Sequence, residues 1–343
     1  MKAIIKDKPG PGLVLKDVNK AKKLGPREVL VKIRRASICG TDVHIFKWDE
    51  WSQSRINPPL IVGHEMAGEV VEVGDAVTQV KVGDFVSAET HIPCEHCVQC
   101  KTGRMHVCKN LEILGVDRSG VFTEYAVIPE TVLWKFSPEI PLDFASVMEP
   151  FGNAIHTALV TDLTGKKVLI TGAGPIGLMA IQVAKASGAS LVISSEVDPL
   201  RIEMAKNNGA DIVINPIEQD LVKSIYTISP DGVDVLLEMS GNKKALEDGL
   251  KCLTMGGIAS LLGIFGGNID LNLDSLVIMR GITIYGITGR KMFETWKIAD
   301  ELLKSKKVDL SKVVTHVLPF EQWEKGFELM LNKQCGKVVL NFD

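Results

Sequence analysis

The sequence predicts an α/β protein in which a β-rich domain is joined to a doubly wound parallel sheet. Short β-type runs separated by Gly, Pro and Asp fill residues 1–140, whereas helices and strands alternate from about residue 142. A turn containing Gly172, Gly174 and Gly177 lies where one of these strands meets a helix. The length of 343 residues is enough for two domains, each with its own core.

The first 140 residues have the pattern of a mostly antiparallel β-domain. Pairs of turn residues, such as Gly74-Asp75 and Gly83-Asp84, separate short runs rich in β-branched residues. The strands that we expect here are Val29–Arg34, Met66–Val73, Phe85–Ala88 and Phe122–Ile128.

Beyond this region, helix and strand alternate, which predicts a parallel sheet with helices on both faces. Residues 142–162 are expected to be helical, and a further helix is expected at Pro175–Ser187. The expected strands are Lys167–Thr171, Leu191–Ser195, a short one around Val213, Val233–Met239, Ile258–Ile264 and Ile282–Tyr285. We expect the tail of the chain to return to the first domain through helices at 291–306 and 320–332 and a strand at Lys337–Leu340.

The composition is that of an ordinary globular protein, with 45% hydrophobic and 24% charged residues and a net charge of −3. No excess of Lys or Arg indicates a nucleic-acid surface, and a small polar substrate fits this charge balance. The first residues lack the apolar run of a signal peptide, and no stretch approaches 18 uninterrupted apolar residues. We therefore expect no membrane span and a cytoplasmic location.

The glycine turn predicts a dinucleotide site. The first Gly permits the tight turn, the second lets a pyrophosphate approach the backbone, and the third lets helix and strand pack closely. Glu196 ends the next strand, 19 residues after Gly177. A carboxylate there can accept hydrogen bonds from the adenosine ribose hydroxyls and would repel a 2′-phosphate, so the sequence favours NAD over NADP.

Arg201 complicates this interpretation, because an Arg near this position can bind a 2′-phosphate. With Glu196 present, we expect Arg201 to pack on the adenine or to pair with Glu196. The alternative is that Arg201 is an exposed helix residue. In the least specific interpretation, the three glycines are plain turn residues and Glu196 is a solvated charge.

Four of the seven cysteines, Cys94, Cys97, Cys100 and Cys108, lie within fifteen residues. Close pairs of thiolates joined by short loops suit a tetrahedral zinc whose positions are all filled by sulfur. Such a site has no open position for a substrate, so we expect it to be structural. The alternative is an iron–sulfur cluster, which would make the protein an electron carrier. The long final spacing and the lack of a following Pro disfavour that alternative.

A second candidate metal site combines a thiolate, an imidazole and a carboxylate. Cys39 is followed 25 residues later by His64 and then by Glu65. This mixed ligand set is expected of a catalytic zinc, since three protein ligands leave one position for a substrate oxygen. Glu149 is a fourth candidate. Considered alone, Cys39 is more typical of a buried core residue, and His64 is more typical of a loop histidine with ordinary hydrogen bonds.

Taken in order, these motifs resemble the zinc-containing medium-chain alcohol dehydrogenases, and the resemblance covers essentially the whole chain. The shared segments are Cys39-Gly40-Thr41-Asp42, Gly63-His64-Glu65, the four-cysteine segment and the glycine turn. Longer stretches resemble the branch of that family that oxidises L-threonine. These stretches are Thr41–Ser52, Glu149–Ala154 with His156, and Gly289–Trp296.

The resemblance implies a GroES-like catalytic domain, residues 1–150 and 291–343, around a Rossmann NAD-binding domain, residues 151–290. Homotetramers are usual in this family. The implied ligands of the catalytic zinc are Cys39, His64 and Glu65. Further cofactor contacts are implied at Ile176, Leu262, Gly263, Ile264, Ile287 and Thr288.

The implied reaction is the oxidation of L-threonine at its β-carbon, with NAD as the hydride acceptor. Thr41 would take the proton of the substrate hydroxyl and pass it through the cofactor ribose to His44. Imidazole suits this last step because it titrates near neutral pH. Without the resemblance, the two residues would be a loop-capping hydroxyl and a surface histidine. Glu149 would bind the zinc directly or through water, or assist this proton transfer.

The substrate is the least constrained part of the prediction. A threonine site needs partners for an ammonium and a carboxylate. The candidate partners of the ammonium are Asp42, Glu65 and Glu149. The candidate partners of the carboxylate are His91 and Arg290. The sequence does not rank the candidates within either group. Oxidation of a vicinal diol or polyol, such as 2,3-butanediol or sorbitol, stays open as an alternative.

Overall fold

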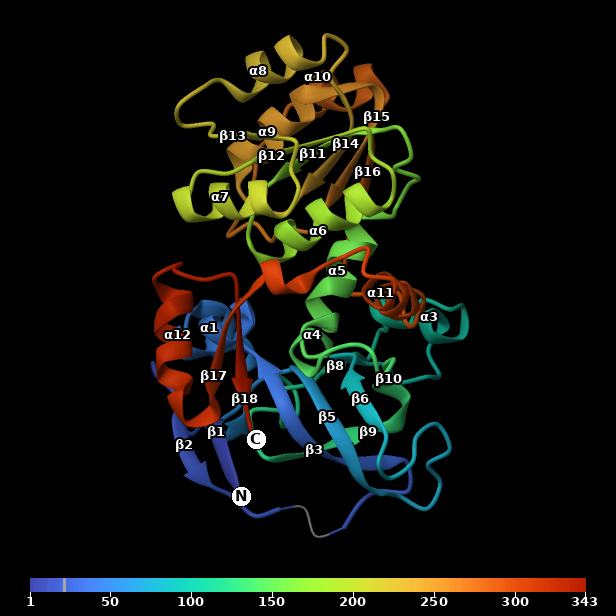
Figure 1. Cartoon of the computed structure of the whole chain (residues 1–343), viewed down its shortest axis with the longest axis vertical. Helices are drawn as coiled ribbons and strands as arrows, with labels where there is room; N and C mark the ends of the chain where they lie inside the picture. Colours follow the sequence, from blue (N-terminus) through green and yellow to red (C-terminus); the bar gives the residue numbers. More distant parts are fainter. Residues whose placement is uncertain (21–22) are drawn as a thin grey trace. The chain divides into compact units, whose positions relative to one another are not determined.

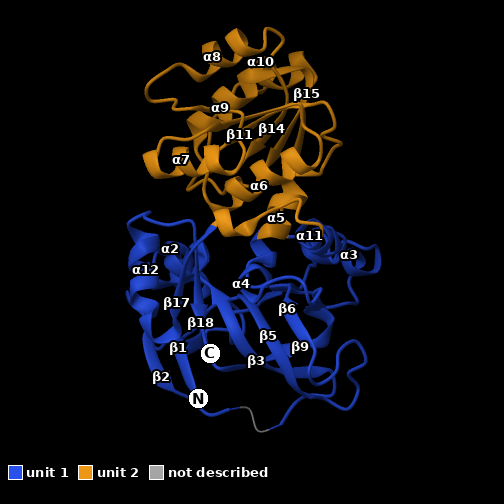
Figure 2. Cartoon of the chain, viewed as in Figure 1, with its two compact units in different colours: residues 1–150, 290–304, 314–343 blue, residues 151–289, 305–313 orange. Residues whose placement is uncertain are grey.

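The structure is a computed structural model, and it describes residues 1–20 and 23–343 (Figure 1). The chain divides into two compact units, coloured separately in Figure 2. Unit 1 consists of Met1–Pro150, Arg290–Lys304 and Val314–Asp343. Unit 2 consists of Phe151–Gly289 and Ser305–Val313.

Unit 1 is built around a seven-stranded sheet whose long strand is β3 (Glu28–Ser37). One edge of β3 pairs with β5 (Glu65–Val73). The other edge pairs first with β9 (Tyr125–Pro129) and then, near Ser37, with β18 (Lys337–Asn341). The strand order β10-β6-β5-β3-β18-β17 is completed by β6 (Phe85–Ala88), β10 (Leu133–Lys135) and β17 (Val314–Pro319).

Shorter elements surround this sheet. Two smaller sheets contain β1 (Lys2–Lys6), β2 (Val14–Asp17) and β4 (Leu60–Ile61), and β7 (His91–Ile92) and β8 (Glu112–Ile113). The α-helices of unit 1 are α1 (Gly40–Lys47), α2 (Glu50–Arg55), α3 (Val98–Lys101), α4 (Leu142–Ala145), α11 (Glu294–Lys304) and α12 (Trp323–Leu331). Helix α5 (Met148–Ala158) begins in unit 1 and ends in unit 2.

The core of unit 1 is formed by alternate residues of its strands and by the apolar side of α12. Phe327 of α12 stacks on Phe46 of α1, with ring centroids 5.2 Å apart, and meets Phe122 edge-on at 6.5 Å. Burial of such aromatic side chains is a large stabilising contribution. The returning tail therefore packs into the core of the N-terminal region.

Unit 2 contains a six-stranded sheet in which every pair is parallel. Its strands are β11 (Lys167–Thr171), β12 (Leu191–Ser195), β13 (Ile212–Ile214), β14 (Val233–Glu238), β15 (Leu253–Leu261) and β16 (Thr283–Gly286). The order β13-β12-β11-β14-β15-β16 reverses direction between β11 and β14. This is the strand order of a Rossmann fold, in which ligands bind outside the carboxyl ends of the strands at that reversal.

Helices cover both faces of this sheet. Helices α6 (Pro175–Ala186) and α7 (Pro199–Asn207) lie on one face, and α8 (Leu221–Ile228) and α9 (Lys243–Cys252) lie on the other (Figure 1). A short helix, α10 (Leu273–Leu276), precedes β16. The single-turn 3-10 helices of the chain are Met105–Val107, Glu130–Val132, Ile278–Arg280, Leu310–Lys312 and Phe320–Gln322.

Most of the expected elements are confirmed, and those at β6, β11 and β12 coincide with the predicted bounds. The predicted helical region 142–162 is two helices, α4 and α5, separated by Ser146 and Val147. Strand β9 begins at Tyr125, three residues later than expected. Strand β17 was not expected from the sequence at all.

The two units differ from the expected domain boundaries at two points. Residues 305–313, expected with the first domain, belong to unit 2. There, the Gln182 side chain donates to the backbone oxygen of Asp309 at 2.9 Å and accepts from its N–H at 2.7 Å. Arg290, expected with the second domain, belongs to unit 1, because its guanidinium donates to the buried carboxylate of Glu89. Across residues 1–20 and 23–343, the helices are all too short or too polar to span a bilayer.

Candidate active site and metal centres

The mixed ligand set comes together at the end of the β3 and β5 pair. Ser37 and Glu65 are register partners on these strands, so Cys39, two residues beyond β3, lies beside His64 and Glu65. The ligand atoms of Cys39, His64 and Glu65 all lie within 4.8 Å of one another. His64 and Glu65 are buried, and Cys39 is half-buried as the N-cap of α1.

The turn before β5 depends on a glycine. Gly63 has φ of +87°, and a Cβ at this position would lie 2.3 Å from Cδ1 of Phe122. Only glycine adopts this backbone conformation without strain and leaves room for the ring. The Gly-His-Glu sequence thus turns the chain so that His64 is directed to the thiol of Cys39.

The charges at this site suit a cation. Glu65 Oε1 is buried and has no hydrogen-bond partner within the described part of the chain, whereas His64 Nδ1 and Asp42 Oδ1 lie 3.7 Å apart as an ion pair. Burial would lower the pKa of His64, but the negative charges of Asp42 and Cys39 raise that pKa to about 10. Unpaired buried acceptors are costly, and a divalent metal would satisfy sulfur, nitrogen and oxygen together. The residues therefore fit a catalytic zinc.

The two carboxylate oxygens of Glu65 have different surroundings. Oε2 accepts hydrogen bonds from the Ser37 hydroxyl and from the Lys337 ammonium, whose Nζ lies 2.5 Å away. Oε1 is the oxygen without a hydrogen-bond partner among the described residues. This arrangement leaves Oε1 available to a metal while Oε2 fixes the orientation of the carboxylate.

Glu149 lies in a different set of contacts. Its Oε1 is 2.6 Å from Nη1 of Arg290, and it is not grouped with the three candidate ligands. Arg290 also forms a two-point contact with the carboxylate of Glu89, and all three side chains are buried. Burial raises the pKa of Glu149, and the Arg290 charge opposes that rise. The guanidinium of Arg290 is thus already engaged by two carboxylates.

The two relay candidates, Thr41 and His44, lie one turn apart on α1. The Thr41 hydroxyl is 3.8 Å from Sγ of Cys39, so it is next to the candidate metal site. His44 is exposed, with 59% of its side chain accessible, and its Nδ1 contacts Oδ2 of Asp49. The structure therefore places one relay candidate at the metal site and the other at the protein surface.

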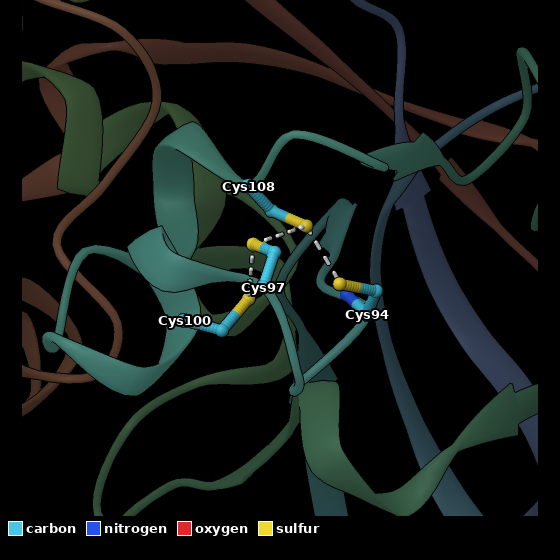
Figure 3. Close-up of side chains that lie close together, drawn as sticks. All are labelled: Cys94, Cys97, Cys100 and Cys108. Atoms are coloured by element: carbon cyan, nitrogen blue, oxygen red, sulfur yellow. Dashed lines mark hydrogen bonds between the residues drawn. The ribbon is translucent and has the colours of Figure 1, made fainter.

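The four-cysteine segment forms a separate, closed group (Figure 3). All four sulfur atoms lie within 4.8 Å of one another, and Sγ of Cys97 is 3.5 Å from that of Cys100 and 3.8 Å from that of Cys108. Four thiolates at about 2.3 Å from a tetrahedral zinc would be separated by about 3.8 Å. The spacing matches a zinc whose coordination positions are all sulfur.

The thiols of this group differ in acidity. Backbone N–H groups of Cys100 and Lys109 stabilise the Cys97 thiolate and lower its pKa to about 6. Burial and the neighbouring thiols of Cys97 and Cys108 raise the pKa of Cys100 to about 12. Four adjacent thiolates repel one another unless a cation lies among them, and zinc supplies that cation.

The glycine turn of unit 2 has the geometry of a dinucleotide site. Gly172 has φ of +89°, and Gly174 is the N-cap of the twelve-residue helix α6. A Cβ on Gly177 would lie 2.1 Å from the oxygen of Gly172, so only glycine allows the helix this close to the turn. The free N–H groups at the start of α6, including that of Ile176, and its dipole favour a pyrophosphate there.

Glu196 lies at the end of β12, as expected, and its buried carboxylate also holds the local backbone. It accepts hydrogen bonds from the N–H groups of Ala173 and Val197, both at 2.7 Å, and of Asp198 at 3.0 Å. In the described residues, the hydrogen bonds of the Glu196 carboxylate are to backbone N–H groups and not to Arg201, whose buried Nε has no hydrogen-bond partner there. Pairing with Glu196 is therefore not the role of Arg201 in this structure.

The other expected cofactor contacts follow the carboxyl ends of neighbouring parallel strands. Leu262 and Gly263 donate from their backbone nitrogens to Glu238 O, and Ile287 donates to Leu261 O. Ile264 is exposed, and Thr288 follows Ile287 beyond the end of β16. These segments and the glycine turn thus share one edge of the sheet.

Two residues of these sites were missed from the sequence. Lys337, on the last strand, contacts Glu65 from a position 272 residues away, and no local pattern reveals such a pairing. Glu238 ends β14, and its buried carboxylate accepts from the backbone of Ser240 and Gly241. A carboxylate ending a buried apolar strand is a signal that could have identified Glu238, as it did Glu196.

Comparison with known proteins agrees with this geometry. Residues 25–139 match the family described as "Alcohol dehydrogenase GroES-like domain", and residues 175–305 match the family described as "Zinc-binding dehydrogenase". The chain belongs to the zinc-binding medium-chain alcohol dehydrogenases and is an oxidoreductase. The fold class and the family expected from the motifs are confirmed.

Within this family, the chain is 52% identical over 341 residues to the L-threonine 3-dehydrogenase of Pyrococcus horikoshii, covering 99% of this chain and 98% of that protein. Among solved structures, an alcohol dehydrogenase from Thermus sp. ATN1 superposes with a TM-score of 0.92 at 27% identity, over 99% of both chains. The 2R,3R-butanediol dehydrogenase of Bacillus subtilis superposes with a TM-score of 0.90 at 26% identity, over 100% of this chain and 99% of that one.

Proposed function

We propose that this chain oxidises L-threonine to L-2-amino-3-oxobutanoate with NAD, in threonine catabolism. The observation that carries the proposal is full-length identity of 52% to a protein named L-threonine 3-dehydrogenase. The three-ligand group at Cys39, His64 and Glu65 supports it, because such a set leaves a position for the substrate hydroxyl. The four-cysteine group would hold a second, structural zinc. The zinc-binding family disfavours the iron–sulfur alternative.

The chemistry divides between the bound groups and the protein. When bound, zinc lowers the pKa of the substrate hydroxyl and NAD accepts the hydride. The protein must orient the substrate and remove one proton. Thr41, beside Cys39, takes the hydroxyl proton, and the exposed His44 releases it to solvent.

The charges of the site favour a substrate with an ammonium group. The carboxylates of Asp42, Glu65 and Glu149 are all buried here. Glu149 is paired with Arg290 and Glu65 with Lys337, so Asp42, whose nearest charged partner is His64 at 3.7 Å, is the ammonium partner that we favour. Of the two candidates for the substrate carboxylate, Arg290 is engaged by Glu89 and Glu149. We therefore favour His91, which burial and the Arg290 charge keep neutral by lowering its pKa to about 4.

In this proposal, unit 1 is the catalytic domain and unit 2 binds NAD at the glycine turn. Preference for NAD over NADP rests on Glu196, whose carboxylate would repel a 2′-phosphate. The cofactor also contacts Arg201 and the strand ends at Leu262–Ile264 and Ile287–Thr288.

A homotetramer and a cytoplasmic location complete the proposal. Exposed apolar side chains in the 3-10 helix that precedes β16, Ile278 and Met279, support contact with other copies of the chain. Seven cysteines without a disulfide support a reducing compartment. Light scattering on the purified protein measures the assembly directly.

The test is NADH formation with a panel of substrates under identical conditions: L-threonine, D-threonine, 2,3-butanediol, sorbitol and ethanol. L-threonine should give the highest kcat/KM. A substrate that lacks the ammonium or the carboxylate should lose roughly two to four orders of magnitude, because buried polar groups of the site are left unpaired. A preference for the diol would replace threonine with the alternative substrate class.

A further inference from the structure

The turn between α1 and α2 brings His44 and Asp49 into contact. Trp48 ends α1 in the left-handed conformation, with φ of 60°, and its N–H donates to His44 O at 2.9 Å. This reverses the chain and returns Asp49 to the imidazole, where its Oδ2 meets Nδ1 of His44. The ring of Trp51 lies edge-on to the same imidazole, with centroids 6.3 Å apart. The His44 ring thus contacts Asp49 of the turn and the ring of Trp51 on α2.

Asp49 uses its other oxygen to begin α2. Oδ1 accepts hydrogen bonds from the backbone N–H and the hydroxyl of Ser52, both at 3.0 Å, which makes Asp49 the N-cap of the helix. Burial would raise the pKa of Asp49, but these bonds and His44 lower it overall. Asp49 is therefore ionised at neutral pH, and an ionised carboxylate can only accept hydrogen bonds.

The direction of this contact determines the state of the imidazole. Because Oδ2 can only accept, Nδ1 of His44 must carry a hydrogen, and the lone pair of the neutral ring is then on Nε2. We propose that Asp49 is a positioning residue that holds His44 in the Nδ1–H tautomer and so prepares Nε2 to accept the departing proton. This inference rests on the relay role given to His44 in the proposed function.

The proton balance is simple. Nε2 accepts one proton, which makes His44 an imidazolium whose charge is stabilised by the Asp49 carboxylate. Nε2 then releases the proton to water, because 59% of the His44 side chain is accessible. The neutral Nδ1–H form is restored, and Asp49 gains or loses no proton in the cycle.

The sharpest test is Asp49→Asn, because asparagine is an equally good N-cap. The Ser52 N–H needs an acceptor, so the amide oxygen of the variant must face Ser52 and the amide NH2 must face His44. Nδ1 of His44 would then have to accept a hydrogen bond from this NH2, which places the hydrogen of the neutral ring on Nε2. Nε2 could then no longer accept the departing proton. The fold should be retained, and Tm should be nearly unchanged.

Two measurements distinguish a positioning role of Asp49 from a merely structural one. The 15N shifts of the His44 ring in the free protein should report the Nδ1–H tautomer in the wild type and the Nε2–H tautomer in Asp49→Asn. Turnover with L-threonine should fall about 100-fold in kcat, the order of a lost acid–base contribution, with little change in KM. Added imidazole should restore part of the kcat, since it can replace His44 as the proton acceptor.

The matched control is Asp117→Asn. Asp117 pairs with Arg55 of α2 at 2.8 and 2.6 Å and accepts from the Ile113 N–H. In the described part of the chain it makes no hydrogen bond or ion pair with His44. This control should keep the kcat and the tautomer of the wild type. Asp49→Ser is a second variant for the case that Asp49→Asn does not fold. Serine is also a good N-cap, but its short side chain does not reach His44. Asp49→Ser should therefore fold and should have a lower kcat than the wild type.

An Nδ1–H tautomer that persists in Asp49→Asn, or an equal loss of kcat in Asp117→Asn, would overturn the inference. Failure of the proposed function looks different. If the wild type does not oxidise L-threonine, the substrate assignment fails, while the 15N shifts still decide whether Asp49 sets the tautomer of His44.

Discussion

Lys337, on the last strand of the chain, places its ammonium 2.5 Å from Oε2 of Glu65, and both side chains are buried. Glu65 is the one carboxylate that pairs with Lys337 among the described residues, and the ammonium also donates to the backbone oxygen of Ile38 at 3.1 Å. The returning tail therefore contributes to the candidate metal site as well as to the core. It neutralises the candidate ligand Glu65 and leaves the other carboxylate oxygen free.

The first prediction concerns this pair. Lys337→Met should destabilise the zinc-free protein by about 3–5 kcal/mol, because it leaves the Glu65 carboxylate buried without its partner. Glu65→Gln in the same chain should recover much of that loss, since no unpaired charge then remains. Denaturant unfolding of the two single variants and the double variant measures the coupling.

The control for this cycle is Lys297→Met on α11, where the lysine is exposed and a change within about 0.5 kcal/mol is expected. Additive effects of Lys337→Met and Glu65→Gln would show that the two side chains do not stabilise each other.

The second prediction separates the two metal sites. Cys39→Ser should lower turnover by about 10³-fold with little change in Tm, because the metal contributes several kcal/mol to the transition state. Cys97→Ser should lower Tm by roughly 5–10 °C, because binding of a structural zinc is coupled to folding. Metal analysis should find two zinc ions per chain in the wild type and one in each variant.

Cys252→Ala is the matched cysteine control, since Cys252 is buried in unit 2 and belongs to neither metal group. It should retain both zinc ions. If Cys39→Ser lost stability while Cys97→Ser lost only turnover, the structural and catalytic roles would be reversed.

Local patterns predicted the parts of this protein that depend on local interactions. Strands β11 and β12 and the glycine turn between β11 and α6 were found because buried parallel strands are continuous apolar runs and the turn needs glycine. The grouping of Cys39 with His64 could be proposed from spacing and family resemblance. The structure adds the register of β3 and β5, which explains why they meet.

What could not be predicted depends on contacts between distant segments. The pairing of Arg290 with Glu89 joins residues 201 positions apart, and the exchange of hydrogen bonds between Gln182 and Asp309 joins residues 127 apart. Each pairing satisfies a buried polar group only after the chain has folded, so neither leaves a periodic pattern in the sequence. These contacts account for the two differences in the expected domain boundaries.

The third prediction concerns the cofactor. Glu196→Ala should reduce kcat/KM for NAD by about 10–100-fold, the cost of a lost charged hydrogen bond of about 1.5–3 kcal/mol. The gap between NAD and NADP should narrow, because the charge that repels a 2′-phosphate is removed. Part of the loss should come from the glycine turn, since Ala173 N–H loses its acceptor.

Glu203→Ala on α7 is the control, because its carboxylate is exposed and, within residues 1–20 and 23–343, pairs with Lys206 of the next turn alone. It should use NAD as the wild type does. Equal kcat/KM values for NAD and NADP in the wild type would contradict the proposal that Glu196 excludes the 2′-phosphate, regardless of the results with the variants.

The last prediction is a pH dependence of stability that arises at Glu130, which is not a member of either metal group. Its carboxylate is buried and accepts from the N–H groups of Thr78 and Gln79 and from Arg27. Burial would raise the pKa of Glu130, but these donors lower it overall. Because the pKa is lower in the folded protein, the stabilisation is full above the unfolded pKa of about 4.3 and is lost as pH falls through the folded pKa.

Glu130→Gln should therefore cost about 2 kcal/mol of unfolding free energy at pH 7, since a neutral amide makes weaker hydrogen bonds than a carboxylate. The difference between wild type and variant should shrink below about pH 4. Denaturant unfolding at a series of pH values measures it, with Glu324→Gln on the exposed side of α12 as the control. A difference that stays constant from pH 7 to pH 3 would mean that the contribution of Glu130 does not come from its ionised form.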